Sequence, residues 1–280
     1  MQLPPKLKVL KVEGLFKGYK VEEESSKSIA VVQNSCLEEL DLTWLCRLNM
    51  QHGCVACLEG IQHLLSLKTL ILRGWDDIED LPEYVCRLPS LSKLSMIGWK
   101  ALKSLPESFG QLISLTHLDL RRCNDLRELP SSFDELKCLQ HLSLNGCSRV
   151  KELPHNFGQL SLLKYLNLSM CQHLKELPQS FGQLTSLQRL YLSGCISLKE
   201  LPSCFGKLTA LQYLDLSFCI KLEKLPSTFV QLKALKILRL CECWQLKELC
   251  LGFEEVASLE ELDIRECREL RVDLSPIENR

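Results

Sequence analysis

Leucines recur through most of the chain at a fixed interval of 24 residues. In the pattern Leu-x-x-Leu-x-Leu, the first leucine falls at nine evenly spaced positions: Leu67, Leu91, Leu115, Leu139, Leu163, Leu187, Leu211, Leu235 and Leu259. Two earlier matches begin at Leu7 and Leu37, each 30 residues before the next. A fixed period of this length indicates a stack of similar coils, each burying its apolar face against its neighbours. The sequence predicts eleven coils, nine of them regular.

Each regular coil reads roughly Leu-x-x-Leu-x-Leu-x-x-Cys-x-x-Leu-x-x-Leu-Pro-x-x-Phe-x-x-Leu. The first third alternates apolar and polar residues, which predicts a short strand with one buried face. The proline cannot donate a hydrogen bond in a central ladder, so the outer segment should begin there. The following Phe-x-x-Leu has the spacing of one or two helical turns.

This pattern predicts an α/β solenoid with a parallel sheet on one side and short helices or turns on the other. A strand and a helix differ in width, so the stack should form a horseshoe arc with the strands on its concave face. Each strand should begin within about two residues of the first leucine. Two regions are expected: irregular N-terminal repeats with insertions over residues 1–66, and regular 24-residue repeats over 67–280 that end in an atypical last coil.

The chain contains 16 cysteines, and seven of them follow the repeat: Cys123, Cys147, Cys171, Cys195, Cys219, Cys243 and Cys267. A disulfide framework in a small secreted domain has uneven cysteine spacings instead. A column at the repeat period indicates one structural position that takes a small, buried side chain, whose thiol donates weakly to a backbone carbonyl. We therefore expect reduced thiols and a cytoplasmic protein.

The composition argues against two classes of binding partner, nucleic acid and membrane. The chain has 34 Lys and Arg against 35 Asp and Glu, whereas nucleic-acid and membrane-surface binders usually have a basic excess. The N-terminal residues lack the apolar core of a signal peptide, and no stretch approaches the ~20 apolar residues that span a bilayer. We expect neither nucleic acid nor membrane as a partner.

The repeat resembles the intracellular leucine-rich repeats of plant nucleotide-binding disease-resistance proteins. Segments 177–187 (LPQSFGQLTSL) and 192–195 (LSGC) are similar to that family in style. The resemblance covers about residues 67–275 well and the first 66 poorly. It implies ligand sensing, and a nucleotide-binding domain in the same or another chain as a partner.

The chain departs from that family in what it omits. It contains no Gly-x-x-x-x-Gly-Lys-Ser/Thr phosphate loop, since the segment 14–20 (GLFKGYK) lacks the required spacing. It also opens in mid-repeat, because Leu3-Pro4 precedes Leu7 as Leu-Pro precedes a strand elsewhere. A fragment of a receptor and a truncated relative acting in trans are both consistent with this.

Two groups of residues could carry chemistry. Cys54 and Cys57 have metal-ligand spacing with His52 and His63 nearby, but a second ligand pair at a fixed interval is missing. Buried thiols explain them better. His117 and His141 occupy equivalent strand positions near column cysteines, but those cysteines should face inward, away from the histidines. We expect no metal, no cofactor and no catalytic site.

The outward-facing strand positions are the candidate binding surface. Tyrosine and arginine contribute strongly to protein interfaces, and they gather over adjacent coils. The predicted partner-binding residues are Tyr165, Arg189, Tyr191, Tyr213, Phe218, His117, His141, Arg121 and Arg122. Basic residues Arg73 and Lys93 should lie on the N-terminal side of the aromatic cluster, and Glu242, Glu261, Asp263 and Glu266 on its C-terminal side.

The expected function is protein–protein recognition, most closely resembling ligand sensing in plant innate immunity. A leucine-rich-repeat signalling scaffold or a ubiquitin-ligase substrate adaptor is the alternative, although the adaptor would need a helical F-box-like segment that the sequence does not show. Scattered thiols are the only feature that suggests an enzyme.

Overall fold

The computed structural model describes residues 6–11, 36–43, 58 and 60–271, which divide into unit 1 (Met1–Cys147) and unit 2 (Ser148–Arg280). Unit 1 contains strands β1 (Val9–Lys11), β2 (Glu39–Asp41), β3 (Thr69–Ile71), β4 (Lys93–Ser95), β5 (His117–Asp119) and β6 (His141–Ser143). Unit 2 contains β7 (Tyr165–Asn167), β8 (Arg189–Tyr191), β9 (Tyr213–Asp215), β10 (Ile237–Arg239) and β11 (Glu261–Asp263).

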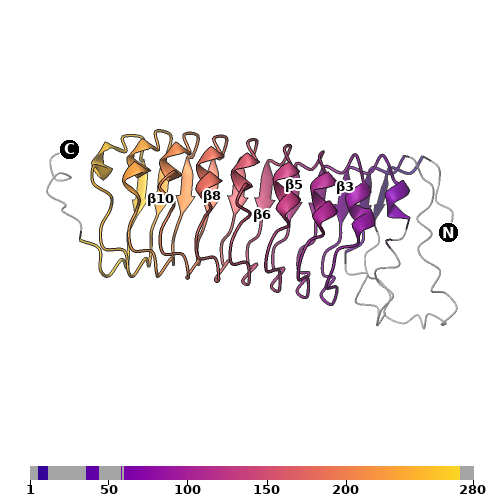
Figure 1. Ribbon diagram of the computed structural model, residues 1–280, viewed down its shortest axis with the longest axis horizontal. Coiled ribbons are helices and arrows are strands. Elements are labelled where there is room, and N and C mark those ends of the chain that lie inside the picture. Colours follow the sequence, from indigo (N-terminus) through magenta and orange to yellow (C-terminus); the bar gives the residue numbers. More distant parts are fainter. Residues whose placement is uncertain (1–5, 12–35, 44–57, 59, 272–280) are drawn as a thin grey trace. The chain divides into compact units, whose positions relative to one another are not determined.

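The strands of each unit pair in parallel and in sequence order (Figure 1). Equivalent positions of neighbouring coils are paired in register, as in Lys93↔His117↔His141 in unit 1 and Tyr165↔Arg189↔Tyr213 in unit 2. Every strand begins two residues after the first leucine of its coil. The predicted leucine-rich-repeat solenoid with parallel strands is confirmed.

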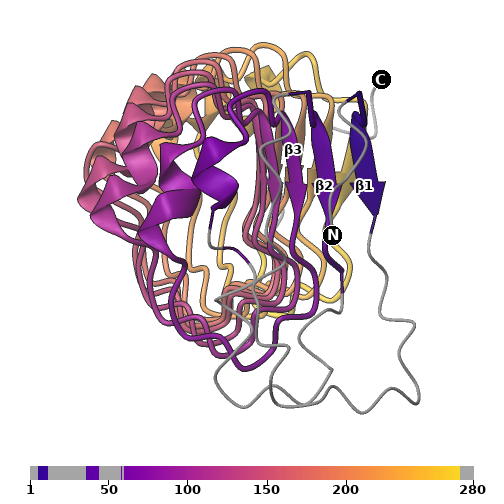
Figure 2. The same cartoon turned by 90° about the vertical axis from the view of Figure 1, so that its right-hand side faces the viewer.

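The opposite side of the coils carries short 3-10 helices (Figure 2). In unit 1 these are η4 (Ile61–His63), η5 (Glu83–Arg87), η6 (Glu107–Gln111) and η7 (Ser131–Glu135). In unit 2 they are η8 (Phe157–Gln159), η9 (Gln179–Gln183), η10 (Phe205–Lys207), η11 (Ser227–Gln231) and η12 (Phe253–Glu255). The repeated proline begins this side as predicted, since Pro178 precedes η9 with extended backbone and its carbonyl accepts the Phe181 N–H.

The core is built from columns of identical side chains. The central leucines of β2 to β10 and the outer phenylalanines from Phe109 to Phe229 are buried almost completely. In unit 2 the rings of Phe157, Phe181, Phe205 and Phe229 stack with centroids 6.1–6.3 Å apart. Paired strands lie only ~4.8 Å apart. Neighbouring coils are therefore spaced further apart at the stacked phenylalanines than at the strands.

The Phe-Gly pair of the outer segment has a steric cause. A Cβ at Gly158 would overlap the backbone carbonyl oxygen of Ser180 in the next coil. The Ser180 hydroxyl in turn accepts a hydrogen bond from the Gly158 N–H at 3.1 Å and donates to the His155 carbonyl. Glycine is needed here because neighbouring coils approach closely, and not because of its own backbone angles.

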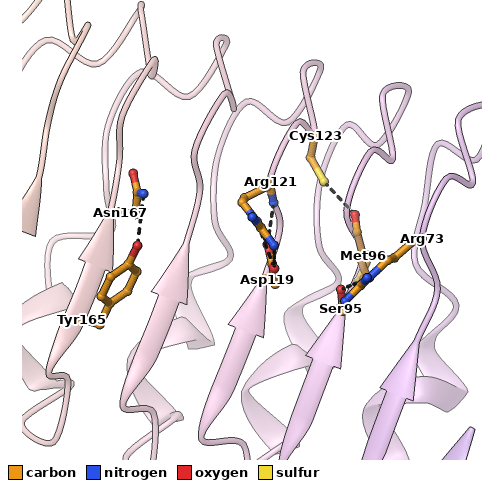
Figure 3. A network of polar contacts seen from close by, with 8 residues as sticks. All are labelled: Arg73, Ser95, Met96, Asp119, Arg121, Cys123, Tyr165 and Asn167. Atoms are coloured by element: carbon orange, nitrogen blue, oxygen red, sulfur yellow. Dashed lines mark hydrogen bonds and ion pairs between the residues drawn. The ribbon is translucent and has the colours of Figure 1, made fainter. Parts of the chain in front are cut away.

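Six of the seven column cysteines are buried, and none of the seven forms a disulfide. Six of the seven donate to a backbone carbonyl of the preceding coil, as Cys123 does to Met96 at 3.3 Å (Figure 3) and Cys195 to Leu168 at 3.2 Å. The last member, Cys267, makes the same bond but is only partly buried. The predicted role of this position is confirmed.

Two tryptophans occupy the same position in earlier coils, which the sequence analysis missed. Trp75 and Trp99 lie eight residues after the first leucines of their coils, as each column cysteine does. Their indole N–H groups donate to the carbonyls of Leu42 and Leu72 in the preceding coils. The two rings stack with centroids 5.6 Å apart. The position therefore requires a buried donor, and an indole fills it as well as a thiol.

Candidate functional site

In each regular coil, the third residue after the strand has a left-handed backbone conformation. In all nine regular coils the residue seven places after the first leucine has a positive φ. Four coils have glycine there (Gly74, Gly98, Gly146 and Gly194) and five have Arg122, Met170, Phe218, Glu242 or Glu266. Left-handed backbone costs a residue with a Cβ roughly 1–2 kcal/mol. We call this place the turn position.

Most of the non-glycine turn residues follow a strand that ends in Asp or Asn, and the side chain of that Asp or Asn supports the turn by a hydrogen bond. The side chains of Asp119, Asn167, Asp215 and Asp263 each accept the backbone N–H two residues later. The turn residues of those coils are Arg122, Met170, Phe218 and Glu266, none of them glycine. Coils with Ser95, Ser143 or Tyr191 at the equivalent strand position have glycine at the turn instead. The polar strand residue thus stabilises the turn that displays a large side chain.

In unit 2 the three predicted tyrosines form one cluster on the strand face. Tyr191 lies between the other two, with ring centroids 5.3 Å from Tyr165 and 4.8 Å from Tyr213. The Tyr165 hydroxyl accepts a hydrogen bond from Asn167 at 3.3 Å (Figure 3). All three side chains are half-buried. Burial and the nearby Asp215 carboxylate raise the pKa of Tyr213, so its hydroxyl stays neutral.

Arg189 lies between Tyr165 and Tyr213 in the strand register and is exposed. Within the part of the chain that the structure describes, no carboxylate binds its guanidinium. The other strand-face arginines of unit 2 are engaged. Arg239 lies over the Tyr213 ring at 5.8 Å and pairs with Glu261 at 3.3 Å, while Arg265 forms a two-point bond to Asp263.

Phe218 is exposed as predicted, with 46% of its surface accessible, and Met170 is exposed to a similar extent at 48%. Both occupy turn positions, one in the coil of β9 and the other in the coil of β7. Met170 was not among the predicted binding residues. Ser169 beside it is only 9% exposed, and its N–H is bound to Asn167.

The acidic C-terminal side is less acidic than its residues suggested. Arg239 neutralises Glu261, and the hydrogen bonds from Arg265 lower the pKa of the Asp263 carboxyl to about 2. Glu242 and Glu266 remain at turn positions without an ion pair among the described residues.

Unit 1 carries a different ring cluster on its strands. The imidazoles of His117 and His141 stack face to face, with centroids 4.3 Å apart and planes 6° from parallel. The Thr116 hydroxyl lies 2.8 Å from His117 Nδ1. Burial, the second histidine and Lys93 all lower the pKa of His117.

The predicted basic residues of unit 1 are only partly available. Asp119 binds Arg121 at two points, with the Nη2–Oδ2 distance at 2.7 Å, and Arg73 Nε donates to the Ser95 hydroxyl at 3.4 Å (Figure 3). Arg122 is exposed at its turn position. Of the predicted pair, Arg122 is therefore the better candidate for an intermolecular contact.

No group of three or more potential metal ligands occurs among the described residues. Cys54, Cys57 and His52 lie outside them. The column thiols are poor nucleophiles, because burial raises the pKa of Cys195 well above its usual range and that of Cys243 to about 12. Cys123 points to the Met96 carbonyl, on the opposite side of the strand from the histidines, as expected.

None of the helices within the described residues has the length and apolarity to traverse a bilayer.

Comparison with known proteins supports the repeat. A family model described as "Disease resistance protein RPS4B-like, leucine-rich repeats" matches residues 159–270, and the general Leucine Rich Repeat model matches 114–136 and 138–160. No curated protein matches the chain.

Among solved structures, the leucine-rich-repeat domain of the type III effector XopL is similar. It has a TM-score of 0.63 and 29% identity over 73% of this chain and 71% of that one. The plant peptide hormone receptor RGFR1 in complex with RGF2 aligns with a TM-score of 0.38 and 22% identity, over 75% of this chain and 48% of the receptor. The repeat pattern, the parallel strands and the matches to the two family models together show that the chain is a leucine-rich-repeat domain.

Proposed function

We propose that the chain is a protein-recognition module that binds its partner on the strand face of unit 2, and that it senses ligands in plant innate immunity. The contact surface is Tyr165, Arg189, Tyr191, Tyr213 and Phe218, which we call the unit 2 patch. Aromatic side chains with an unpaired arginine are the composition of an interface hot spot. The main observation behind this proposal is that the three tyrosines contact each other on the strand face. The leucine core beneath them is fully buried.

The rigid backbone of the stack supports this role. The patch side chains stand on paired strands and on turns held by hydrogen bonds, so binding would order little of the chain. The immune role rests on the disease-resistance family model over residues 159–270. Buried thiols that form no disulfide suit a reducing cytoplasm. The His117, His141 and Arg122 surface of unit 1 is proposed as a secondary contact for the same kind of partner.

The test is affinity capture from plant leaf cells challenged with a pathogen, with the parent chain and a Tyr191→Ala/Tyr213→Ala variant. Each substitution should weaken a direct interaction by roughly 2 kcal/mol, so the true partner should be lost from the variant. Tyr84→Ala, on η5 and away from the strand face, is the matched control and should retain it.

Folding of each variant is checked by circular dichroism. Leu190→Ala, which empties a fully buried site, calibrates the loss of stability that the tyrosine variants should not show. Identical partner sets for the parent and the tyrosine variant would refute the proposed surface.

A further inference from the structure

The charge of Arg189 is the first of two observations that define the partner. The two other arginines on or directly after the strands of unit 2 are each matched by a carboxylate, Arg239 by Glu261 and Arg265 by Asp263. Arg189 has a tyrosine on each neighbouring strand and no acidic partner among the described residues. The nearest strand carboxylate in the register, Asp215, is held by the Ser217 N–H. Arg189 therefore presents its donors to solvent.

The second observation is the pair of exposed apolar side chains at turn positions. Met170 and Phe218 belong to the coils on either side of the Arg189 coil, whose own turn residue is Gly194. Both are exposed despite left-handed backbone that glycine would adopt at lower cost. Adjacent strands lie ~4.8 Å apart, so the two coils are separated by about 10 Å, which is the length of about three extended residues.

We infer that the unit 2 patch, together with Met170, binds an extended acidic segment of a partner protein: a carboxylate on Arg189, flanked by two apolar side chains about three residues apart that contact Met170 and Phe218. The inference rests on the proposed function and specifies the partner's chemistry. Arginine and a carboxylate form charge-assisted bonds of complementary shape.

The test uses a phage-displayed library of random linear peptides, selected on the full chain. Peptides that bind the parent and lose binding to Tyr191→Ala/Tyr213→Ala report on the patch. Their sequences should be enriched in Asp or Glu between two apolar residues. Arg189→Gln should weaken them about 10- to 100-fold, as expected for loss of a bond between charged groups. Arg127→Gln is the control, since it removes the same charge from an exposed site outside the strands.

The two apolar contacts have their own variants. Met170→Gly and Phe218→Gly should each weaken the selected peptides while leaving the fold intact, because glycine suits the turn backbone.

The possible outcomes separate the two proposals. Tyrosine-dependent peptides without acidic enrichment, or with unchanged binding to Arg189→Gln, would overturn the acidic segment and leave the patch in place. Basic enrichment would do the same. Absence of any tyrosine-dependent peptide would count against the proposed function, and the inference would fail with it.

Discussion

Units 1 and 2 are built from the same coil, yet they present different chemistry on their strands. Unit 1 displays two stacked imidazoles beside basic residues, whereas unit 2 displays three tyrosines around an unpaired arginine. Beneath both surfaces, the strand leucines Leu118, Leu142, Leu166, Leu190 and Leu214 are buried almost completely. The comparison teaches that the core positions and the displayed positions vary independently, so a binding surface can change without cost to the fold.

The units also differ inside, at the buried donor position, which gives the prediction with the largest effect. Trp99→Ala in unit 1 should cost about 3–5 kcal/mol of unfolding free energy, because it empties a large buried site and leaves the Leu72 carbonyl without its donor. Cys195→Ala in unit 2 should cost only about 1–2 kcal/mol. Urea denaturation followed by circular dichroism measures both, and equal losses would contradict the larger cost expected for the indole.

A smaller effect is expected where neighbouring coils meet at the outer side. Gly158→Ala in unit 2 should cost about 1–3 kcal/mol, since the added methyl group overlaps the Ser180 carbonyl and forces the coils apart. The equivalent residue of unit 1 in η7 is Asp134, where a Cβ is already accommodated. Asp134→Ala should therefore change stability by less than about 0.5 kcal/mol. The two urea midpoints decide this, and a tolerated Gly158→Ala would show that the approach is not tight.

The turn positions give a third contrast, of about 1 kcal/mol. Gly146→Ala in unit 1 should lower stability by about that amount, because alanine disfavours positive φ while its methyl group would make only ordinary contacts. Phe218→Gly in unit 2 should change stability little, since relief of the backbone offsets the entropy of glycine in the unfolded chain. Thermal or urea unfolding tests both. A large loss in Phe218→Gly would mean that Phe218 supports the fold and is not free for a partner.

The sequence predicted the strands and the cysteine column well, because both depend on a period that each coil repeats. The same period places Trp75 and Trp99 in the column, but they were missed. The position was defined by its cysteines, and a much larger side chain with a buried N–H donor did not match that definition. The turn position had a signal in Gly74, Gly98, Gly146 and Gly194, which the five non-glycine coils obscured.

Ion pairing on the strand face could not be predicted from residue types. Glu261 and Asp263 looked free in the sequence, but both face an arginine within reach of their side chains. The period of the repeat predicts which face of the strand a side chain lies on. It does not predict the rotamer of that side chain, which decides whether an ion pair forms. The exposure of Arg189, on which the partner's chemistry depends, is therefore visible only in the structure.

The smallest predicted effect is a pH dependence confined to unit 1. The pKa of His117 is lowered in the folded state by burial, His141 and Lys93, so the folded form resists protonation more than the unfolded chain does. Its contribution is complete above the unfolded pKa of about 6.5 and is lost as the pH falls from there through the lower folded value. The parent should lose stability between about pH 7 and pH 5 partly for this reason. His117→Gln should flatten that slope, whereas His173→Gln, an exposed histidine of unit 2 outside the strands, should retain it. Urea midpoints across this range measure the slopes, and an unchanged slope in His117→Gln would mean that the stacked pair does not govern the acid response of unit 1.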